Sequence, residues 1–257
     1  MMRIALLTDF GTRDPYVAAV KGVIAARTEA PIIDLTHEIP PYDVFGAAWF
    51  LRAIVRYWPA ETIFVCVVDP GVGSSRRIIA VEQEGRVFLA PDNGLLSLVL
   101  GPRSSVLGFV VTNESLFLPD GSNTFHGRDR FAPVAAAIAN GLPLDQLGPR
   151  IDEIVQLPYE PPQYGDVVRG SIVAVDRFGN LITDIEAARI PFTPFVLEAH
   201  GIVIDRLETH YAGAAPGAFL IVGSSGCIEI SVANGSAAER LQMRRLGRVE
   251  VCRIDRR

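Results

Sequence analysis

The side chains best suited to chemistry follow apolar runs in the first half of the chain. Asp9 ends RIALLTD, His37 follows IIDLT, Asp69 ends TIFVCVVD, and His126 lies in NTFHGRDRFAP before a helical pattern. Ligands of open α/β sheets bind beyond the carboxyl ends of the strands, so polar residues there are the first candidates for a site. Carboxylates and imidazoles at such positions can bind hydroxyl groups, orient water and move protons.

The segment DPGVGSSRR, from Asp69 to Arg77, adds positive charge to this set. Pro-Gly-x-Gly after a buried strand predicts a tight turn that lets the backbone approach a ligand. Arg76 and Arg77 are close enough in sequence to fold back onto the Asp69 carboxylate. A structural Asp–Arg turn is one alternative. A phosphate cradle is another, but the chain has no Walker lysine and no GxGxxG motif to support it.

Each candidate also has a structural interpretation. Asp9 can accept hydrogen bonds from the vicinal hydroxyls of a ribose, or it can form an Asx-turn or a helix cap. His37 is equally consistent with a turn, and His126 with a structural hydrogen-bonding residue. The sequence offers neither an acid cluster for a divalent metal nor a serine in a GxSxG elbow, which argues against metal hydrolases and acyl enzymes.

An alternation of short apolar runs and helical patterns over the first 150 residues predicts the elements that position these side chains. Strands are expected at 3–9, 31–36 and 62–69, and two more around a turn at Glu84-Gly85. Helices are expected at about 15–27, 44–57 and 131–140, and a short one after Asp92, which Asp92 would cap. Such alternation is typical of an α/β domain with a largely parallel central sheet.

The composition changes in LPYEPPQYGD, residues 157–166, where three prolines and a glycine indicate an extended linker. Short β-type runs separated by Gly and Asn turns follow, and they predict a small antiparallel barrel or sandwich. We therefore expect an N-terminal α/β domain over 1–157, a linker over 158–166 and a smaller, barrel-like C-terminal all-β domain over 167–257.

The overall composition excludes several classes of protein. The chain has 257 residues, 49% of them hydrophobic, and a net charge of −5, which argues against intrinsic disorder. No apolar run approaches the roughly 20 residues of a membrane helix, and an acidic residue interrupts the apolar start, so a cytoplasmic protein is expected. Cys66, Cys227 and Cys252 are isolated and lack ligand spacing, so neither a disulfide framework nor a cysteine metal site is predicted.

Basic residues are concentrated at the C-terminus. Residues 240–257 carry seven arginines and two acidic residues, a charge of +5, which leaves −10 on residues 1–239. A nucleic-acid-binding tail is one interpretation. We favour a solvated C-terminal strand and turn on an acidic protein, with no nucleic acid or membrane as partner.

Beyond these local patterns, a series of motifs resembles the S-adenosylmethionine (SAM) hydroxide adenosyltransferases, a family of adenosine-forming hydrolases. In chain order the motifs are TDFG, KG at Lys21, DLTHEI, PYDV, DPGVGSSRR, APDNGLL, TFHGRD, DRFGN and SSGCIEI. They span nearly the whole chain. The SAM-dependent fluorinases and chlorinases share the fold, so a halogenase is the nearest alternative function, and a non-catalytic nucleoside-binding protein is another.

The resemblance implies hydrolysis of SAM to adenosine and L-methionine by in-line attack of an activated water on the ribose C5′, with no metal or cofactor. It implies that Asp69, Arg76 and His126 hold this water, with either Asp69 or His126 as the proton acceptor. Halogenases carry a halide-contacting serine beside the position of His126, whereas this chain has Gly127. Water is therefore the expected nucleophile.

The resemblance also implies a set of substrate contacts. Asp9 would bind the ribose hydroxyls and Tyr42 would pack against the sugar. The C-terminal domain would hold adenine and the methionine moiety through Asp176, Phe178, Asn180, Ser224 and Ser225. Of these, Ser225 replaces the arginine that binds the methionine carboxylate in halogenases. Family members form homotrimers with active sites between the N-terminal domain of one subunit and the C-terminal domain of its neighbour, and adenosine is the ligand expected to co-purify.

Overall fold

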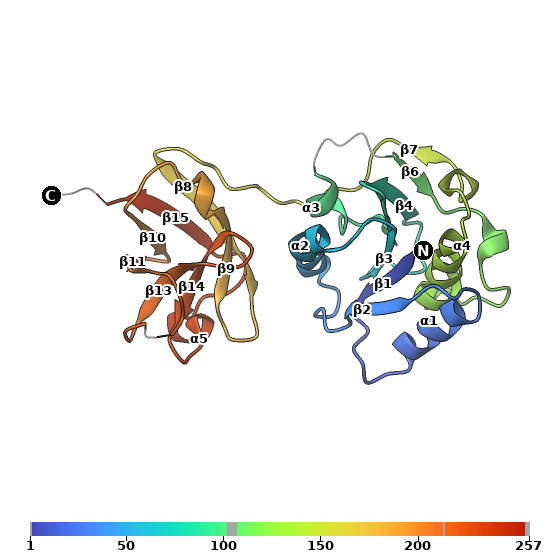
Figure 1. Cartoon of the computed structure of the whole chain (residues 1–257), viewed down its shortest axis with the longest axis horizontal. Coiled ribbons are helices and arrows are strands. Elements are labelled where there is room, and N and C mark those ends of the chain that lie inside the picture. The colour runs from blue at the N-terminus through green and yellow to red at the C-terminus, as the bar shows by residue number, and fades with distance from the viewer. Residues whose placement is uncertain (1, 102–106, 213, 255–257) are drawn as a thin grey trace. The chain divides into compact units, whose positions relative to one another are not determined.

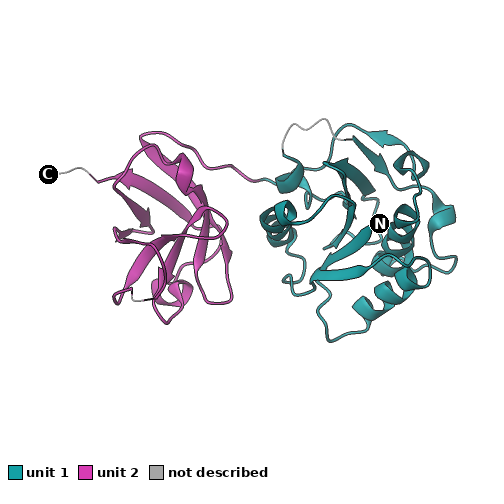
Figure 2. Cartoon of the chain, viewed as in Figure 1, with its two compact units in different colours: residues 1–158 teal, residues 159–257 magenta. Residues whose placement is uncertain are grey.

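The computed structural model describes residues 2–101, 107–212 and 214–254 (Figure 1). The chain divides into two compact units, Met1–Pro158 and Tyr159–Arg257 (Figure 2). Within the described ranges, no helix is long and apolar enough to cross a membrane.

Unit 1 is built on a mixed sheet of seven strands in its described residues, in the order β2-β1-β3-β5-β4-β6-β7. Neighbouring strands from β2 to β5 pair in parallel, whereas β4, β6 and β7 pair antiparallel. The predicted α/β domain is confirmed, and its parallel part carries the strand ends where the site was expected. The strands are β1 Arg3–Thr8, β2 Ile32–Thr36, β3 Thr62–Val67, β4 Ile78–Gln83, β5 Arg86–Pro91, β6 Leu107–Val110 and β7 Arg150–Ile151.

Both faces of this sheet are covered, which explains the uninterrupted apolar runs. Along β1, Ile4 and Leu6 face a core formed with α1 and α4, whereas Ala5 and Leu7 face a core formed with α2 and α3 (Figure 1). The helices are α1 Tyr16–Ala25, α2 Val44–Ile54, α3 Ser97–Leu100 and α4 Ala132–Ala139, with 3-10 turns η1 Val55–Tyr57, η2 Glu114–Leu116 and η4 Leu144–Gln146.

Two of the predicted helices differ in detail from the expectation. The helix expected over 44–57 is α-helical only to Ile54, and its last turn tightens into the 3-10 turn η1. The helix expected from Phe131 is preceded by a π-helical turn, η3, over Gly127–Phe131. π-turns occur frequently at functional sites, and this one directly follows His126.

Unit 2 is a curled sheet of eight strands in its described part, in the order β11-β10-β15-β8-β9-β14-β13-β12 (Figure 1). The pairs are antiparallel except β12–β13, and the sheet wraps around one apolar core as a half-barrel, which confirms the barrel-like all-β prediction. Its elements are β8 Val167–Val175, β9 Leu181–Glu186, η5 Ala187–Arg189, β10 Phe195–Ala199, β11 Ile202–Ile204, β12 Leu207–Glu208, β13 Ala218–Val222, β14 Cys227–Val232, α5 Ala237–Leu241 and β15 Arg248–Arg253.

Two arginines of the basic C-terminal cluster have defined positions in this fold. Arg248 and Arg253 begin and end β15, and the Arg253 guanidinium lies 5.6 Å from the centre of the Phe192 ring. Arg169 on β8 pairs with Glu250 of β15. The last residues of the basic cluster, 255–257, lie outside the described residues.

Candidate active site

A buried ion pair stands two residues beyond the end of β3. The turn after Asp69 closes with hydrogen bonds from Val72 N to Asp69 O and from Ser74 N to Gly71 O, at 3.2 and 3.1 Å. It brings Arg76 back onto the Asp69 carboxylate, where Arg76 Nε donates to Oδ2 at 2.8 Å and to Oδ1 at 3.0 Å. Only 5% of the Asp69 side chain and 10% of the Arg76 side chain are exposed. The pair is therefore largely shielded from bulk solvent and fixed in orientation.

His126 extends this pair to three residues. Arg76 Nη2 lies 2.8 Å from His126 Nδ1. Because a guanidinium can only donate hydrogen bonds, Nδ1 is the acceptor and the neutral ring carries its proton on Nε2. Burial, together with the positive charges of Arg130 and Arg76, lowers the pKa of His126, which favours this neutral form. His126 Nε2 is buried and has no hydrogen-bond partner among the described residues.

The loop before His126 is held by a second buried carboxylate. Asp129 is 1% exposed, accepts a hydrogen bond from Ser122 N at 2.7 Å and pairs with Arg128. Hydrogen bonding to Ser122 and Arg128 outweighs burial and leaves the pKa of Asp129 below its usual value. Asp129 therefore stays ionised and fixes the loop that carries His126.

Asp9 and Tyr42 lie in the same cavity as Asp69 and His126. This cavity has a volume of about 240 Å³ and is lined by residues that follow β1, β2 and β3. Tyr42 N donates to Asp9 Oδ2 at 2.9 Å, which joins the two loops. The Tyr42 side chain is 72% exposed, so it offers a flat apolar face at the cavity rim. Four of the predicted site residues thus meet in unit 1, with Arg76 hydrogen-bonded behind them.

Gly127 is closely packed by two aromatic rings. A Cβ atom at this position would stand 3.1 Å from Phe10 Cζ and 3.4 Å from Phe125 Cε2. A side chain here would therefore require Phe10 to shift by a few tenths of an ångström. The absence of a side-chain donor at this position, expected from the sequence, is reinforced by the packing around it.

Three of the five residues predicted in the C-terminal domain, Asp176, Phe178 and Asn180, line a separate cavity of about 750 Å³ in unit 2. Asp176 organises one wall of it: Asp176 Oδ1 accepts Phe178 N and Asn180 N at 2.9 and 2.8 Å, and Oδ2 accepts Asn180 Nδ2 at 2.8 Å. This turn presents the ring of Phe178, which is 76% exposed. An exposed aromatic ring beside a fixed amide suits a planar base. Asn234 and Ser236 line the same cavity.

Ser224 and Ser225 lie apart from this lining, in the turn between β13 and β14. Ser225 Oγ accepts Cys227 N at 3.4 Å, a bond internal to the turn. Sequence reasoning missed Tyr211, which lines the cavity and donates to Glu229 Oε2 at 2.9 Å. Burial raises the pKa of Tyr211 to about 12, and it also raises the pKa of Glu229. The available signal in the sequence was Glu229, a single acidic residue inside the apolar run CIEISV, which could have pointed to the Tyr211–Glu229 pair.

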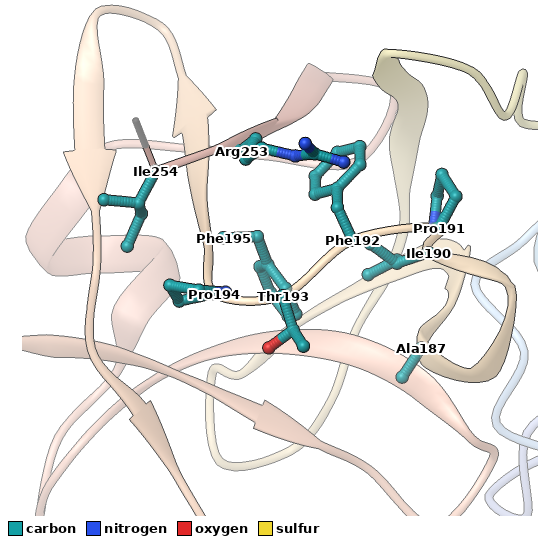
Figure 3. A pocket seen from close by; sticks show the side chains of 9 residues that line it. All are labelled: Ala187, Ile190, Pro191, Phe192, Thr193, Pro194, Phe195, Arg253 and Ile254. Carbon is teal, nitrogen blue, oxygen red and sulfur yellow. The ribbon is translucent and has the colours of Figure 1, made fainter. Parts of the chain in front are cut away.

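A cavity of about 780 Å³ in unit 2 has a different character (Figure 3). Arg253 extends across the ring of Phe192, and the only uncharged polar side chain drawn is that of Thr193 (Figure 3). The residues that line this cavity include no carboxylate, imidazole or thiol. This lining offers little for catalysis.

Arg77 does not contact Asp69, contrary to one of the two expectations for this turn. It pairs instead with Asp92, which is 6% exposed and also accepts Val155 N at 2.8 Å. Asp92 is thus held by the residue before β4 and by the end of unit 1. The expectation that it caps a helix was wrong, because α3 begins only at Ser97 and has Leu96 at its N-cap. Within the described residues, no group of three His, Cys, Asp or Glu could hold a metal ion.

The fold and these side chains define a class of protein: a two-domain enzyme with a buried carboxylate–guanidinium–imidazole group at the strand ends of an α/β unit. The chain belongs to the SAM hydroxide adenosyltransferase family, because residues 4–148 match its N-terminal domain and residues 170–250 its C-terminal domain. The family indicated by the motifs is thereby confirmed.

Individual relatives agree with this assignment. The chain is 39% identical to the (R)-S-adenosyl-L-methionine hydrolase of Thermus thermophilus, with 95% of this chain and 97% of the relative covered. It is 32% identical to the Methanocaldococcus jannaschii protein of the same name, covering 96% and 95%. A fluorinase from an Actinoplanes species is 29% identical over 71% of each chain. The crystal structure of an uncharacterized conserved protein from Thermotoga maritima superposes with a TM-score of 0.89, at 34% identity over 97% of this chain and 100% of that one.

Proposed function

We propose that this chain hydrolyses (R)-SAM to adenosine and L-methionine with a water molecule held by Asp69, Arg76 and His126. The enzyme class, a SAM hydrolase, agrees with the family match and with full-length relatives of that name at 32–39% identity. The observation that carries the residue roles is the hydrogen-bonded group itself, buried and open to the cavity that also contains Asp9.

The reaction makes modest demands on the protein. The water oxygen forms a bond to C5′ while the C5′–S bond breaks. The electron pair of the C5′–S bond stays with sulfur, which converts the sulfonium to the neutral thioether of methionine. One proton leaves the water. Because the leaving group is neutral and needs no acid, the protein has to hold the water in line with the C–S bond and make it more hydroxide-like.

Asp69 is the proton acceptor in this scheme. His126 Nδ1 already accepts from Arg76, and its Nε2 carries the ring proton, so His126 acts as a hydrogen-bond donor. Arg76 is too weak an acid to take part in proton transfer, and it stabilises the developing hydroxide and the Asp69 carboxylate. A carboxylate has about four acceptor positions, so Asp69 can bind both Arg76 and a water.

The substrate contacts rest on the family resemblance and, except for Ser224 and Ser225, on residues that line the two cavities. We assign the ribose hydroxyls to Asp9 and the face of the sugar to Tyr42. Adenine stacks on Phe178 and meets Asn180, and Asp176 with Ser224 receives the methionine ammonium. Ser225 remains the candidate for the methionine carboxylate, although its hydroxyl now accepts a backbone N–H within its own turn.

Halide use is disfavoured by a specific feature of the site. The position beside His126 is glycine, which offers no side-chain donor, and the ring of Phe10 packs tightly against it. Asp69, Arg76 and His126 disfavour a non-catalytic nucleoside-binding protein, because binding alone does not require a buried donor and acceptor beside the ribose C5′.

We also propose that the chain forms homotrimers in which unit 1 of one subunit and unit 2 of its neighbour supply one active site. The ribose and water residues lie in unit 1 and the adenine residues in unit 2, so one site needs both. A cytoplasmic location is consistent with three cysteines that form no disulfide within the described residues. Light scattering with a purified sample tests the trimer directly.

The test of function is incubation of the purified enzyme with SAM and chromatography of the products. Equal amounts of adenosine and methionine are expected, and the Asp69→Ala variant should lose turnover while it still binds adenosine. Absence of adenosine at high enzyme concentration would contradict the proposed function. Mass spectrometry of any ligand carried by the purified protein is expected to detect adenosine.

A further inference from the structure

Four side chains from β1, β2, the residue after β2 and α1 form a chain of polar contacts beside Asp9. Thr8 Oγ1 lies 2.8 Å from His37 Nδ1, and His37 Nε2 lies 3.0 Å from Asp34 Oδ1. Lys21 Nζ then donates to Asp34 Oδ2 at 2.6 Å. Thr8 and His37 are 3% and 4% exposed, whereas the side chains of Lys21 and Asp34 reach the surface.

The contacts along this chain differ in kind. Thr8 Oγ1 accepts Phe10 N at 3.2 Å and is hydrogen-bonded to His37 Nδ1. His37 Nε2 and Asp34 Oδ1 are close enough for a polar contact, but their geometry is not that of a hydrogen bond. Burial raises the pKa of Asp34, but the interactions with Lys21 and His37 outweigh it and leave that pKa below its usual value. Asp34 is therefore ionised and accepts a hydrogen bond from the Lys21 ammonium.

This chain holds the loop that carries Asp9 on both sides. Phe10 N is fixed by the Thr8 hydroxyl, and Gly11 N donates to His37 O at 2.7 Å. Gly11 has a φ of +66°, a conformation that suits glycine and closes the loop tightly. Within the described residues, Asp9 Oδ2 accepts Tyr42 N and Oδ1 accepts no hydrogen bond. The backbone anchors therefore decide where Oδ1 points.

We propose that Thr8, His37, Asp34 and Lys21 are positioning residues that set the angle at which the Asp9 carboxylate meets the two ribose hydroxyls. This role rests on the ribose-binding function proposed above for Asp9. None of the four side chains is among the residues that line the Asp9 cavity, so they act through the loop and not by touching the substrate. Binding of two vicinal hydroxyls by one carboxylate depends strongly on orientation, so a small rotation of the loop weakens it.

Two nucleosides separate positioning from general stability. Adenosine carries both ribose hydroxyls and 2′,3′-dideoxyadenosine carries neither, so the ratio of their dissociation constants measures what the Asp9 carboxylate contributes. In the wild type this ratio should be at least about tenfold in favour of adenosine, the value of one or two hydrogen bonds to a charged group.

The decisive variant is Thr8→Val, which keeps the shape of the side chain and removes the hydroxyl. It should weaken adenosine about tenfold and change the affinity for dideoxyadenosine less than about twofold, and Thr8→Ser should restore adenosine binding to within about threefold. The matched control is Thr62→Val. Thr62 is fully buried, and its hydroxyl donates to Pro59 O at 2.8 Å. It begins β3 and so lies at the end of that strand opposite to Asp69. Its loss should lower stability and leave both dissociation constants unchanged.

A second variant keeps the test valid if Thr8→Val does not fold. Lys21 is the only lysine in the chain and its side chain is 36% exposed, so Lys21→Met is expected to fold. It should weaken adenosine about threefold, and Lys21→Arg should restore it. Unchanged discrimination between the two nucleosides in folded Thr8→Val and Lys21→Met would overturn this role alone. Equal binding of both nucleosides by the wild type would overturn the ribose function of Asp9 and this role with it.

Discussion

Replacing Asp69 with asparagine keeps the size of the side chain and removes its charge, so it separates two consequences of the buried ion pair. The partners are 5% and 10% exposed, and Arg76 would remain buried without its counter-ion. Breaking one side of such a pair costs about 3–5 kcal/mol of unfolding free energy. At roughly 2–4 °C per kcal/mol for a chain of this length, the Tm of Asp69→Asn should fall by about 6–20 °C.

The same substitution removes the proposed proton acceptor. Loss of a positioned general base costs about 10²–10⁴ in rate, so kcat for adenosine formation should fall by that factor at a temperature where the variant is still folded. Calorimetry supplies the Tm, and chromatography of adenosine supplies the rate.

Asp152→Asn is the matched control. Asp152 also belongs to unit 1 and lies 3.6 Å from Arg150, but its side chain is 90% exposed. Its loss should change stability by less than about 0.5 kcal/mol and leave kcat unchanged. If folded Asp69→Asn kept kcat within about threefold of the wild type, Asp69 would not be the proton acceptor and the reasoning from the ion pair would fail.

Three further outcomes are expected. The pKa of His126 is lowered by burial and by the charges of Arg130 and Arg76. Below about pH 6.5 the unfolded chain therefore gains a proton that the folded chain does not, which lowers the stability of the folded state. Calorimetry should show that Tm falls more from pH 7.5 to 5.5 in the wild type than in His126→Gln. Phe178→Ala removes a ring that is 76% exposed, so Tm should hold while the KM for SAM rises roughly 5- to 100-fold, and an unchanged KM would remove Phe178 from the adenine site. Asp92→Ala breaks the pair with Arg77 and the bond to Val155, and denaturant unfolding should show a loss of about 3 kcal/mol with kcat of the folded enzyme intact.

Local sequence patterns were sufficient for the parts of this protein that depend on neighbours in the chain. Apolar runs with both faces buried, such as β1 and β3, are recognisable because almost all of their residues must be apolar to pack on either face. Asp9 and Asp69 are candidates because the carboxyl ends of parallel strands converge. The hairpin turn at Glu84-Gly85 was also predictable from the glycine between two β-type runs, and in the structure both residues have positive φ.

Features that depend on distant partners could not be predicted in this way. Whether Arg76 or Arg77 returns to Asp69 is decided by the turn geometry and by the buried Asp92, which directly follows β5. His37 was equally consistent with a turn, because its partner Thr8 lies 29 residues earlier. The neutral Nε2–H form of His126 follows only from the position of Arg76.

The most direct test of the proposed reaction is hydrolysis of SAM by this enzyme in water enriched in oxygen-18, with chloride present. Attack of water on C5′ predicts adenosine that carries the heavy isotope at its 5′ oxygen, together with unlabelled methionine. Adenosine without the label, or 5′-chloro-5′-deoxyadenosine as the product, would contradict the assignment of water as the nucleophile.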